Sequence, residues 1–325
     1  MYDDVDVRVR SKWACEPVNG VVRLTYLATG AVLLILVVFV NPPTHTTFMY
    51  VLHKSAHSAA FALIALIYLK LAAKTNEADW WKPYVGALGA VLVCGIGTEI
   101  AQFFLHRNPS FEDVLRDATG GTASLAIVSL RQTLMHRGLR ACLALLATAA
   151  SSAAVMPLVW CVAAYAHRDY LFPVILEYQS PLDMYFVKVW NGPASGVDLP
   201  NEWAVRPNEK AIEVGLDAKA PGIRLFETYP DWRGYSTLAI DVTNPNQTSL
   251  ALVARVNAQS PYHCDFRFEL RPQTRSTFRL RVDEIRSAPS CRNLNMRAVA
   301  GMSLYVLAPI TGRMFYVNRI LLEES

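Results

Sequence analysis

The stretch Gly97–Gly121, GTEIAQFFLHRNPSFEDVLRDATGG, places acidic, amide and basic side chains within and beside strongly apolar sequence. Glu99 lies in an apolar run that begins near Tyr84. A carboxylate inside a membrane-spanning helix costs about 2.5–3.5 kcal/mol on insertion scales, so it normally has a polar or charged partner or a functional role. Gln102 follows Glu99 at i+3 and His106 follows it at i+7, so a helix would place the three side chains on one face.

The second part of this stretch predicts a chain reversal and a new helix. Pro109 cannot continue the first helix, and Ser110 is a favourable N-cap. Asp113 follows three residues later and completes an S-x-x-D start signal. The stretch is therefore predicted to be a helical hairpin with a polar tip that carries Arg107.

The composition predicts two parts of different character. Of the 325 residues, 53% are hydrophobic and 18% are charged, which is too apolar for one ordinary soluble domain. Long apolar runs fill the first half, whereas the sequence after about position 169 alternates polar and apolar residues between turn signals. The net charge of +4 is small, and no dense basic patch with interleaved aromatic residues is present. Nucleic acid is therefore not expected as a partner.

The apolar runs of the first half predict a membrane bundle of about five helices. The expected spans cover residues 21–40, 56–73, 84–105, 114–130 and 139–166. The fourth contains Asp117 and is short, so a re-entrant segment is the alternative, which would move the second half to the other side of the membrane. Gly120 and Gly121 would let neighbouring helices approach this segment closely. Five crossings from a cytoplasmic N-terminus leave everything after His167 outside.

The second half predicts an all-β antiparallel sandwich of the jelly-roll type. From about Tyr185 the pattern has period 2, and at least seven short runs rich in β-branched and aromatic residues alternate with turns. Trp232 and Tyr235 are a candidate platform for stacking on a sugar, with core or rim packing as the alternative. Cys264 and Cys291 could form a disulfide, with two unpaired thiols as the alternative.

Polar residues of the first half follow one another in a fixed order across three expected helices. They are Lys54, His57, Glu99, Gln102, Arg107, Asp113 and Asp117. This order resembles the VanZ-like membrane family, whose pattern is Asp-Lys-x-x-His, then Glu-x-x-Gln, then an Arg, an Asp, and an Asn or Asp before Gly. His53 stands where the family usually has Asp. The resemblance covers about residues 21–130 and implies a bacterial cytoplasmic-membrane protein with a link to glycopeptide (teicoplanin) resistance.

The second half resembles galactose-binding and carbohydrate-binding jelly rolls more loosely. The residues that carry this resemblance are DWRGYSTLAIDVTN at 231–244 and the closing run MFYVNRILLEE. The expected domains are then a cytoplasmic tail at 1–20, a VanZ-like four-helix membrane domain at 21–136, a fifth transmembrane helix at 137–168 and an extracytoplasmic β-sandwich at 169–325.

The polar residues of the membrane part have two interpretations: an ion-pair network that braces the hairpin, or an outward-facing pocket for a head group. Lys54, His57 and Arg107 could hold a phosphate or a carboxylate there. No catalytic residue, metal or cofactor is assigned, because no Ser-His-Asp pattern, Gly-rich phosphate loop, H-E-x-x-H or zinc spacing occurs.

Three functions stay open. The first is an envelope protein that binds the lipid bilayer and a lipid-linked or surface glycan. The second is a membrane enzyme that acts on lipid-linked intermediates, with Glu99 as general acid or base. The third is a scaffold whose sandwich docks another envelope protein.

Overall fold

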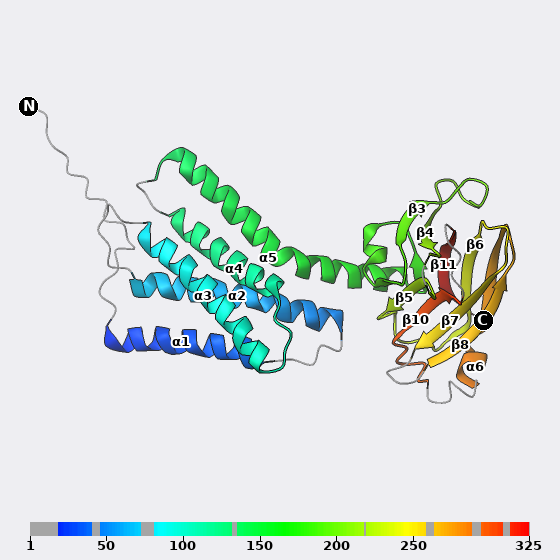
Figure 1. Ribbon diagram of the computed structural model, residues 1–325, viewed down its shortest axis with the longest axis horizontal. Coiled ribbons are helices and arrows are strands. Elements are labelled where there is room, and N and C mark those ends of the chain that lie inside the picture. The colour runs from blue at the N-terminus through cyan, green and yellow to red at the C-terminus, as the bar shows by residue number, and fades with distance from the viewer. Residues whose placement is uncertain are drawn as a thin grey trace, which may run out of the picture. The chain divides into compact units, whose positions relative to one another are not determined.

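The computed structural model describes residues 19–40, 46–72, 81–131, 135–217, 219–257, 263–287, 294–307 and 313–324. The chain divides into two compact units, Met1–Trp160 and Cys161–Ser325, called here the helical unit and the sandwich unit (Figure 1). The boundary falls inside helix α5 (Arg137–Leu171), so the last turns of this helix belong to the sandwich unit.

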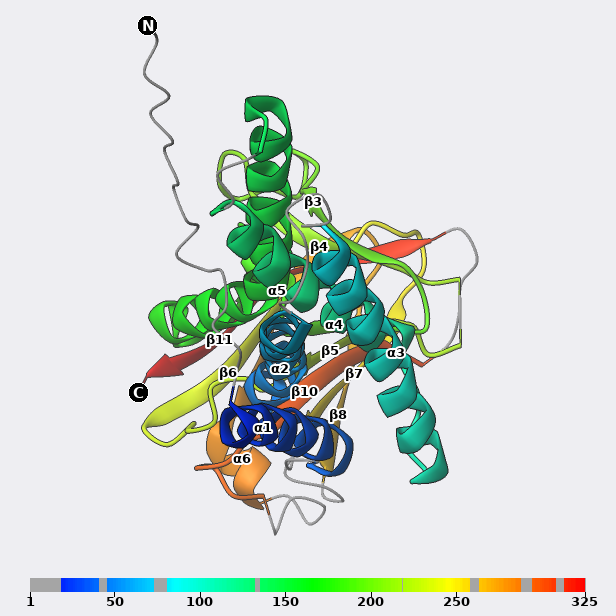
Figure 2. The same ribbon diagram turned by 90° about the vertical axis from the view of Figure 1, so that its left-hand side faces the viewer.

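The helical unit is a bundle in which α1 to α4 pack against one another (Figures 1 and 2). Its helices are α1 (Gly20–Phe39), α2 (Thr47–Ala72), α3 (Lys82–Phe104), α4 (Phe111–Ser129) and the first part of α5. Phe61 of α2 and Val91 of α3 are fully buried in its core. The predicted hairpin is confirmed, because α3 ends at Phe104 and α4 begins at Phe111.

A glycine allows α2 and α4 to approach at backbone distance. A Cβ atom added at Gly120 would lie only 1.9 Å from the carbonyl oxygen of Ser58, which is far inside van der Waals contact. The Ser58 hydroxyl also donates to the carbonyl of Arg116 at 3.0 Å. The close approach expected from the small residues of this helix is therefore present.

Four of the described helices, α1, α2, α3 and α5, are long and apolar enough to cross a membrane. α4 is a helix as predicted, but it is not among these four, because charged residues occupy positions 112, 113, 116 and 117 of its first half. By length and composition four of the described helices qualify as spans, and α4 as a fifth span stays a prediction. Insertion of each helix into a membrane stays a prediction.

The sandwich unit consists of two antiparallel sheets, which confirms the predicted antiparallel sandwich (Figure 1). The six-stranded sheet has the order β3-β4-β11-β6-β9, with β1 paired to β11, and the five-stranded sheet has the order β2-β5-β10-β7-β8. The strands of the first are β1 (Val174–Glu177), β3 (Ala194–Asp198), β4 (Lys210–Gly215), β6 (Tyr235–Asn244), β9 (Thr274–Arg281) and β11 (Met314–Glu324). Those of the second are β2 (Val187–Trp190), β5 (Gly222–Phe226), β7 (Leu250–Asn257), β8 (His263–Leu270) and β10 (Gly301–Val306).

The core of the sandwich lies between the two sheets. Leu238 and Ile240 of β6 and Leu304 of β10 alternate into it and are at most 2% exposed. The 3₁₀ helix η2 (Pro181–Met184) and the short helix α6 (Val282–Ser287) complete the described elements of the unit. β1, β3 and β4 are strands that the sequence pattern did not place, since they lie in or before a region rich in Pro and Gly.

Candidate functional site

The helix hairpin brings most of the predicted polar residues together. Lys54 and His57 come from α2, and each faces a carboxylate of α4: Lys54 hydrogen bonds to Asp113, and Nδ1 of His57 lies 3.3 Å from Oδ1 of Asp117. Asp117 in turn lies close enough to Glu99 of α3 for their charges to interact. Three helices therefore supply one cluster of paired charges.

Asp113 is shared between two cations. Its second oxygen accepts a hydrogen bond of 3.0 Å from Nη1 of Arg116, one helical turn further along α4. Asp113 and Asp117 at i and i+4 would repel each other, so the sequence predicts either Arg107 or Arg116 as a neighbour, and the structure shows Arg116.

His57, Asp117 and Glu99 form a buried acid–base group. Their exposed fractions are 2%, 1% and 6%. Nδ1 of His57, both carboxylate oxygens of Asp117 and Oε1 of Glu99 have no hydrogen-bond partner among the described residues. Buried polar atoms without a hydrogen-bond partner are uncommon and costly, so this group, held by the ion pair between His57 and Asp117, is a candidate for accepting or donating a proton.

Glu99 also ties the two helices of the hairpin together. Its Oε2 accepts a hydrogen bond of 2.5 Å from the backbone N–H of Ser110, the residue that precedes α4. The Ser110 side chain makes no capping bond of its own. The Glu99 carboxylate of α3 thus acts as the N-cap acceptor of α4 in place of the Ser110 side chain.

Gln102 and Arg107 bind a different partner, the end of α1. Nε2 of Gln102 donates to the carbonyl of Val37 at 3.3 Å, and Nη1 of Arg107 donates to the carbonyl of Val38 at 2.9 Å. The last four carbonyls of a helix have no partner inside it, so these two side chains satisfy groups that would otherwise be unpaired. Both residues brace the bundle through hydrogen bonds to α1 rather than through the ion pairs within the hairpin that the structural interpretation expected.

A cavity of about 60 Å³ opens beside the cluster, between α2, α4 and α5. Lys54 and Arg116 contribute the cations of its wall, and its other lining residues are Tyr50, Val51, Ser55, Ser58, Thr119, Ala153, Ala154 and Pro157. The volume has room for roughly four water molecules or a group of similar size. Two cations and several hydroxyl groups around such a space form a site suited to an anion.

The predicted sugar platform of the sandwich is wrong. Trp232 is fully buried in the core, and its Nε1 donates to the carbonyl of Tyr229 at 2.9 Å. Tyr235 packs edge-on against Phe172, with 5.2 Å between ring centroids. Core packing, the alternative interpretation, is what the structure shows.

The predicted disulfide lies partly outside the described residues. Cys264 is disulfide-bonded, but Cys291 lies outside the described part of the chain. The pairing of these two cysteines stays a prediction.

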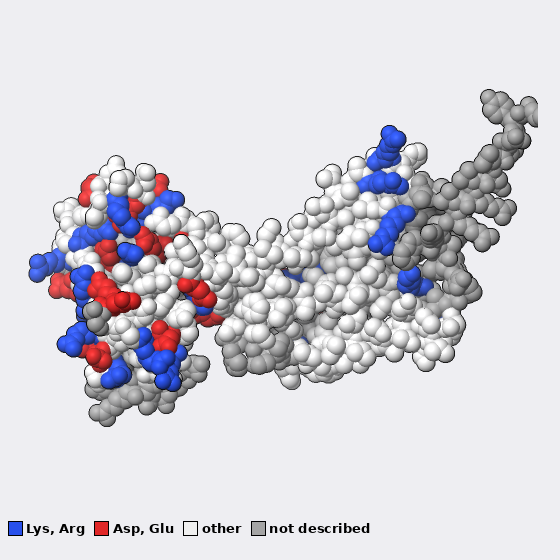
Figure 3. Space-filling view, turned by 180° about the vertical axis from the view of Figure 1, so that it is seen from behind, with Lys and Arg blue, Asp and Glu red and all other residues white. Residues whose placement is uncertain are grey.

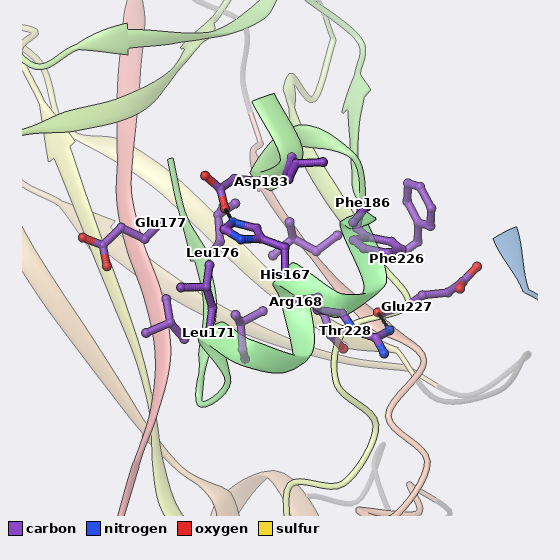
Figure 4. Close-up of a pocket in the computed structure, with 15 residues that line it drawn as sticks. His167, Arg168, Leu171, Leu176, Glu177, Asp183, Phe186, Phe226, Glu227 and Thr228 are labelled. Atoms are coloured by element: carbon purple, nitrogen blue, oxygen red, sulfur yellow. Dashed lines mark hydrogen bonds and ion pairs between the residues drawn. The ribbon is translucent and has the colours of Figure 1, made fainter. Parts of the chain in front are cut away.

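The end of α5 makes a second small cavity, of about 30 Å³, within the sandwich unit (Figure 4). His167 lies 2.7 Å from Asp183, and Nη1 of Arg168 donates to the carbonyl of Glu227 at 2.7 Å. The Tyr165 hydroxyl bonds the Glu227 carboxylate. These polar groups bond to one another, and the space holds roughly two water molecules. We therefore interpret this cavity as a packing gap where the end of α5 contacts the sheets, and not as a ligand site.

Comparisons with known proteins find fold likeness alone. No family model and no curated protein matches the chain. Among solved structures, an exo-β-agarase is 13% identical with a TM-score of 0.38, and the match covers 47% of this chain and 25% of that one. A family 11 carbohydrate-binding module from Clostridium thermocellum, in complex with a β-1,3-1,4-mixed-linked tetrasaccharide, is 10% identical with a TM-score of 0.35, covering 47% and 95%. A family 29 carbohydrate-binding module from Piromyces equi is 10% identical with a TM-score of 0.29, covering 46% and 87%.

Proposed function

We propose that the protein is a membrane receptor of the bacterial envelope that binds the anionic head group of a lipid in the cavity at Lys54 and Arg116. The observation that carries this proposal is that two cations line one cavity and share one buried carboxylate, Asp113. A phosphate oxygen in the cavity would receive charge-assisted hydrogen bonds from both cations, each about twice as strong as a neutral one.

The surface of the helical unit supports a bilayer as its surroundings. Val93, Phe104 and Leu145 are 72–75% exposed, and water is a poor solvent for so many outward-facing apolar side chains. On the face that Figure 3 shows, the helical unit carries few charged side chains among its described residues, whereas the sandwich unit carries both signs. We therefore propose a multi-pass protein of the cytoplasmic membrane.

Contacts along α4 support its crossing the membrane despite its charges. Ser110 at its start bonds Glu99, Asp117 packs at Gly95, and Gly121 packs at Val91. Residues later in α4 contact residues earlier in α3, so the two helices are antiparallel. They would therefore cover a similar depth of the membrane. Asp113 and Asp117 are both buried against neighbouring helices, which would shield them from lipid.

With five crossings and a cytoplasmic N-terminus, the charged cluster lies at the outer face and the sandwich lies outside the cell. There the sandwich is proposed to bind the glycan of a lipid-linked intermediate or of the cell surface. The ordered polar residues support, through their resemblance to the VanZ-like family alone, a link to glycopeptide tolerance. Equal teicoplanin susceptibility of cells that carry the wild-type protein and cells that carry the Glu99→Ala variant at equal abundance would remove this link.

The head-group proposal is tested with the full chain in nanodiscs of neutral phosphatidylcholine. The probes are a polyprenyl phosphate and the corresponding polyprenol, which differ only by the phosphate. We expect the phosphate to bind at least about tenfold more tightly, and Arg116→Gln to remove most of that difference. Lys70→Gln, a charge change at the far end of α2, is the matched control and should bind as the wild type does.

Two outcomes would contradict the head-group proposal. Equal affinity for the phosphate and the alcohol would show that the cations do not face a ligand. Equal loss in Arg116→Gln and Lys70→Gln would show a general effect of charge rather than a site.

A second function, an enzyme that acts on lipid-linked intermediates, is favoured by the buried acid–base group of His57, Asp117 and Glu99. Groups of this kind can give and take protons during hydrolysis or transfer. Purified protein would then turn over a lipid-linked substrate, and Glu99→Gln and Asp117→Asn would each abolish turnover while head-group binding persists. Absence of turnover with bound substrate would reject the enzyme.

A further inference from the structure

Part of the outer face of the six-stranded sheet is covered by the chain that joins β3 to β4. The segment 199–209 packs over it, with Leu199 and Trp203 in one apolar cluster with Tyr316. Arg275 fastens this segment, because its guanidinium reaches Glu209 at 2.8 Å and Asp241 at 2.6 Å.

The outer face of the five-stranded sheet carries exposed basic side chains. Lys188 of β2, Arg224 of β5 and Arg267 of β8 point away from the core and are exposed. Because strands lie about 4.8 Å apart, five of them make a face roughly 19 Å wide.

Two partly exposed aromatic rings form a shelf on this face. Trp190 of β2 and Tyr305 of β10 both pair with Gly222 of β5, which stands between them. Their ring centroids are 5.9 Å apart with an angle of 32° between the planes. Gly222 has to be glycine, because a Cβ there would lie 2.5 Å from the Cβ of Tyr305. Neighbouring rings of this kind present a flat apolar surface to a sugar ring.

Cations surround the aromatic shelf. In the next row of the sheet, Lys188 pairs with Arg224 across β2 and β5, and neither has a carboxylate partner among the described residues. Arg255 lies 5.6 Å from the centroid of the Tyr305 ring but is neutralised by Asp265, at 2.6 and 2.7 Å. The face therefore keeps unpaired positive charge next to its aromatic rings.

We propose that this face binds an acidic glycan, a sugar chain that bears carboxylate groups. Sugar rings would stack on Trp190 and Tyr305, while Lys188 and Arg224 would hold the carboxylates, Arg in bidentate fashion and Lys as a point charge. Charge complementarity selects an acidic chain over a neutral one. The inference rests on the proposal that the sandwich binds an envelope glycan, and it names the class of glycan and the face.

The test uses the full-length protein with polygalacturonate and with the same polymer after reduction of its carboxyl groups. We expect polygalacturonate to bind at least about tenfold more tightly at low salt, with the preference shrinking as salt rises. Trp190→Ala should weaken binding of both polymers by about tenfold, and Trp190→Phe should restore most of it, which separates a lost ring from a misfolded strand. Arg224→Ser should reduce the preference for the acidic polymer while binding of the neutral one persists.

Arg281→Ser is the matched control, because Arg281 is an exposed arginine on β9 of the other sheet. Equal binding of the two polymers would overturn the acidic specificity and leave glycan binding standing. Unchanged binding in Trp190→Ala, or equal losses in Arg224→Ser and Arg281→Ser, would overturn the assignment of the face. Failure to bind either polymer would reject this inference. It would not affect the proposal of head-group binding at Lys54, which is tested separately with polyprenyl phosphate.

Discussion

Glu209→Gln is expected to destabilise the sandwich near neutral pH and to have a smaller effect in acid. The Glu209 side chain is 2% exposed, and it accepts hydrogen bonds from Arg275 at 2.8 and 3.0 Å and from the backbone N–H of Val205 at 2.7 Å. The bonds from Arg275, followed by those from the backbone, lower the pKa of Glu209 from 4.5 to about 2, against the opposing effect of burial.

The size of the effect follows from this pKa shift. A pKa lowered from 4.5 to about 2 corresponds to roughly 3 kcal/mol of differential stabilisation of the charged form. Because the folded pKa lies below the unfolded one, this contribution is fully present above about pH 4.5 and is lost as the pH falls towards 2. Glu209→Gln removes the charge at every pH, so its cost should be largest above pH 4.5.

Hydrogen exchange of the β6 and β9 amides in the full-length protein measures this cost. At pH 7 we expect Glu209→Gln to lower their opening free energy by roughly 3 kcal/mol, and near pH 3 by clearly less. Glu269→Gln is the control, since Glu269 is an exposed carboxylate on β8 and should have little effect at either pH. A cost for Glu209→Gln that is equal at both pH values, or no cost at all, would refute the argument.

Three further outcomes follow from the packing and the cysteines. Gly120→Ala should lower the melting temperature of the helical unit, because its Cβ would meet the backbone of α2, whereas Gly89→Ala, with nothing within 4 Å, should not; equal melting temperatures would contradict the close approach. Trp232→Ala should cost the sandwich about 3–5 kcal/mol, and Trp232→Phe should retain glycan binding, since this indole lies in the core; a selective loss of binding in Trp232→Phe would restore it as a ligand platform. Mass spectrometry of non-reduced peptides should find Cys264 linked to Cys291, and any other partner for Cys264 would reject the predicted pair.

The hairpin could be predicted from the sequence because its signals are local. Pro109 and the S-x-x-D pattern at Ser110 lie within a few residues of the turn that they specify. The partners in the cluster are not local. Lys54 meets Asp113 across 59 positions, and Arg107 turns to the end of α1, which no spacing within the hairpin could indicate.

The sandwich shows the same limit more sharply. Period 2 indicates strands, but Trp232 stands in the loop before β6, where no alternation says whether a ring points inwards. Trp190 ends a strand of only four residues, and its meeting with Tyr305 depends on the order β2-β5-β10. The sequence pattern therefore does not distinguish the buried ring of Trp232 from the partly exposed rings of Trp190 and Tyr305.

The central claim is that Lys54 and Arg116 serve a ligand and not only Asp113, and the affinity of Asp113→Asn for polyprenyl phosphate tests it most directly. Asparagine keeps the shape of the side chain but removes the charge that competes for both cations. If the cavity binds an anionic head group, folded Asp113→Asn should bind polyprenyl phosphate several-fold more tightly than the wild type, with no gain for polyprenol. Unchanged or weaker phosphate binding by the folded variant would contradict the claim and leave the cluster as a brace of the helix hairpin.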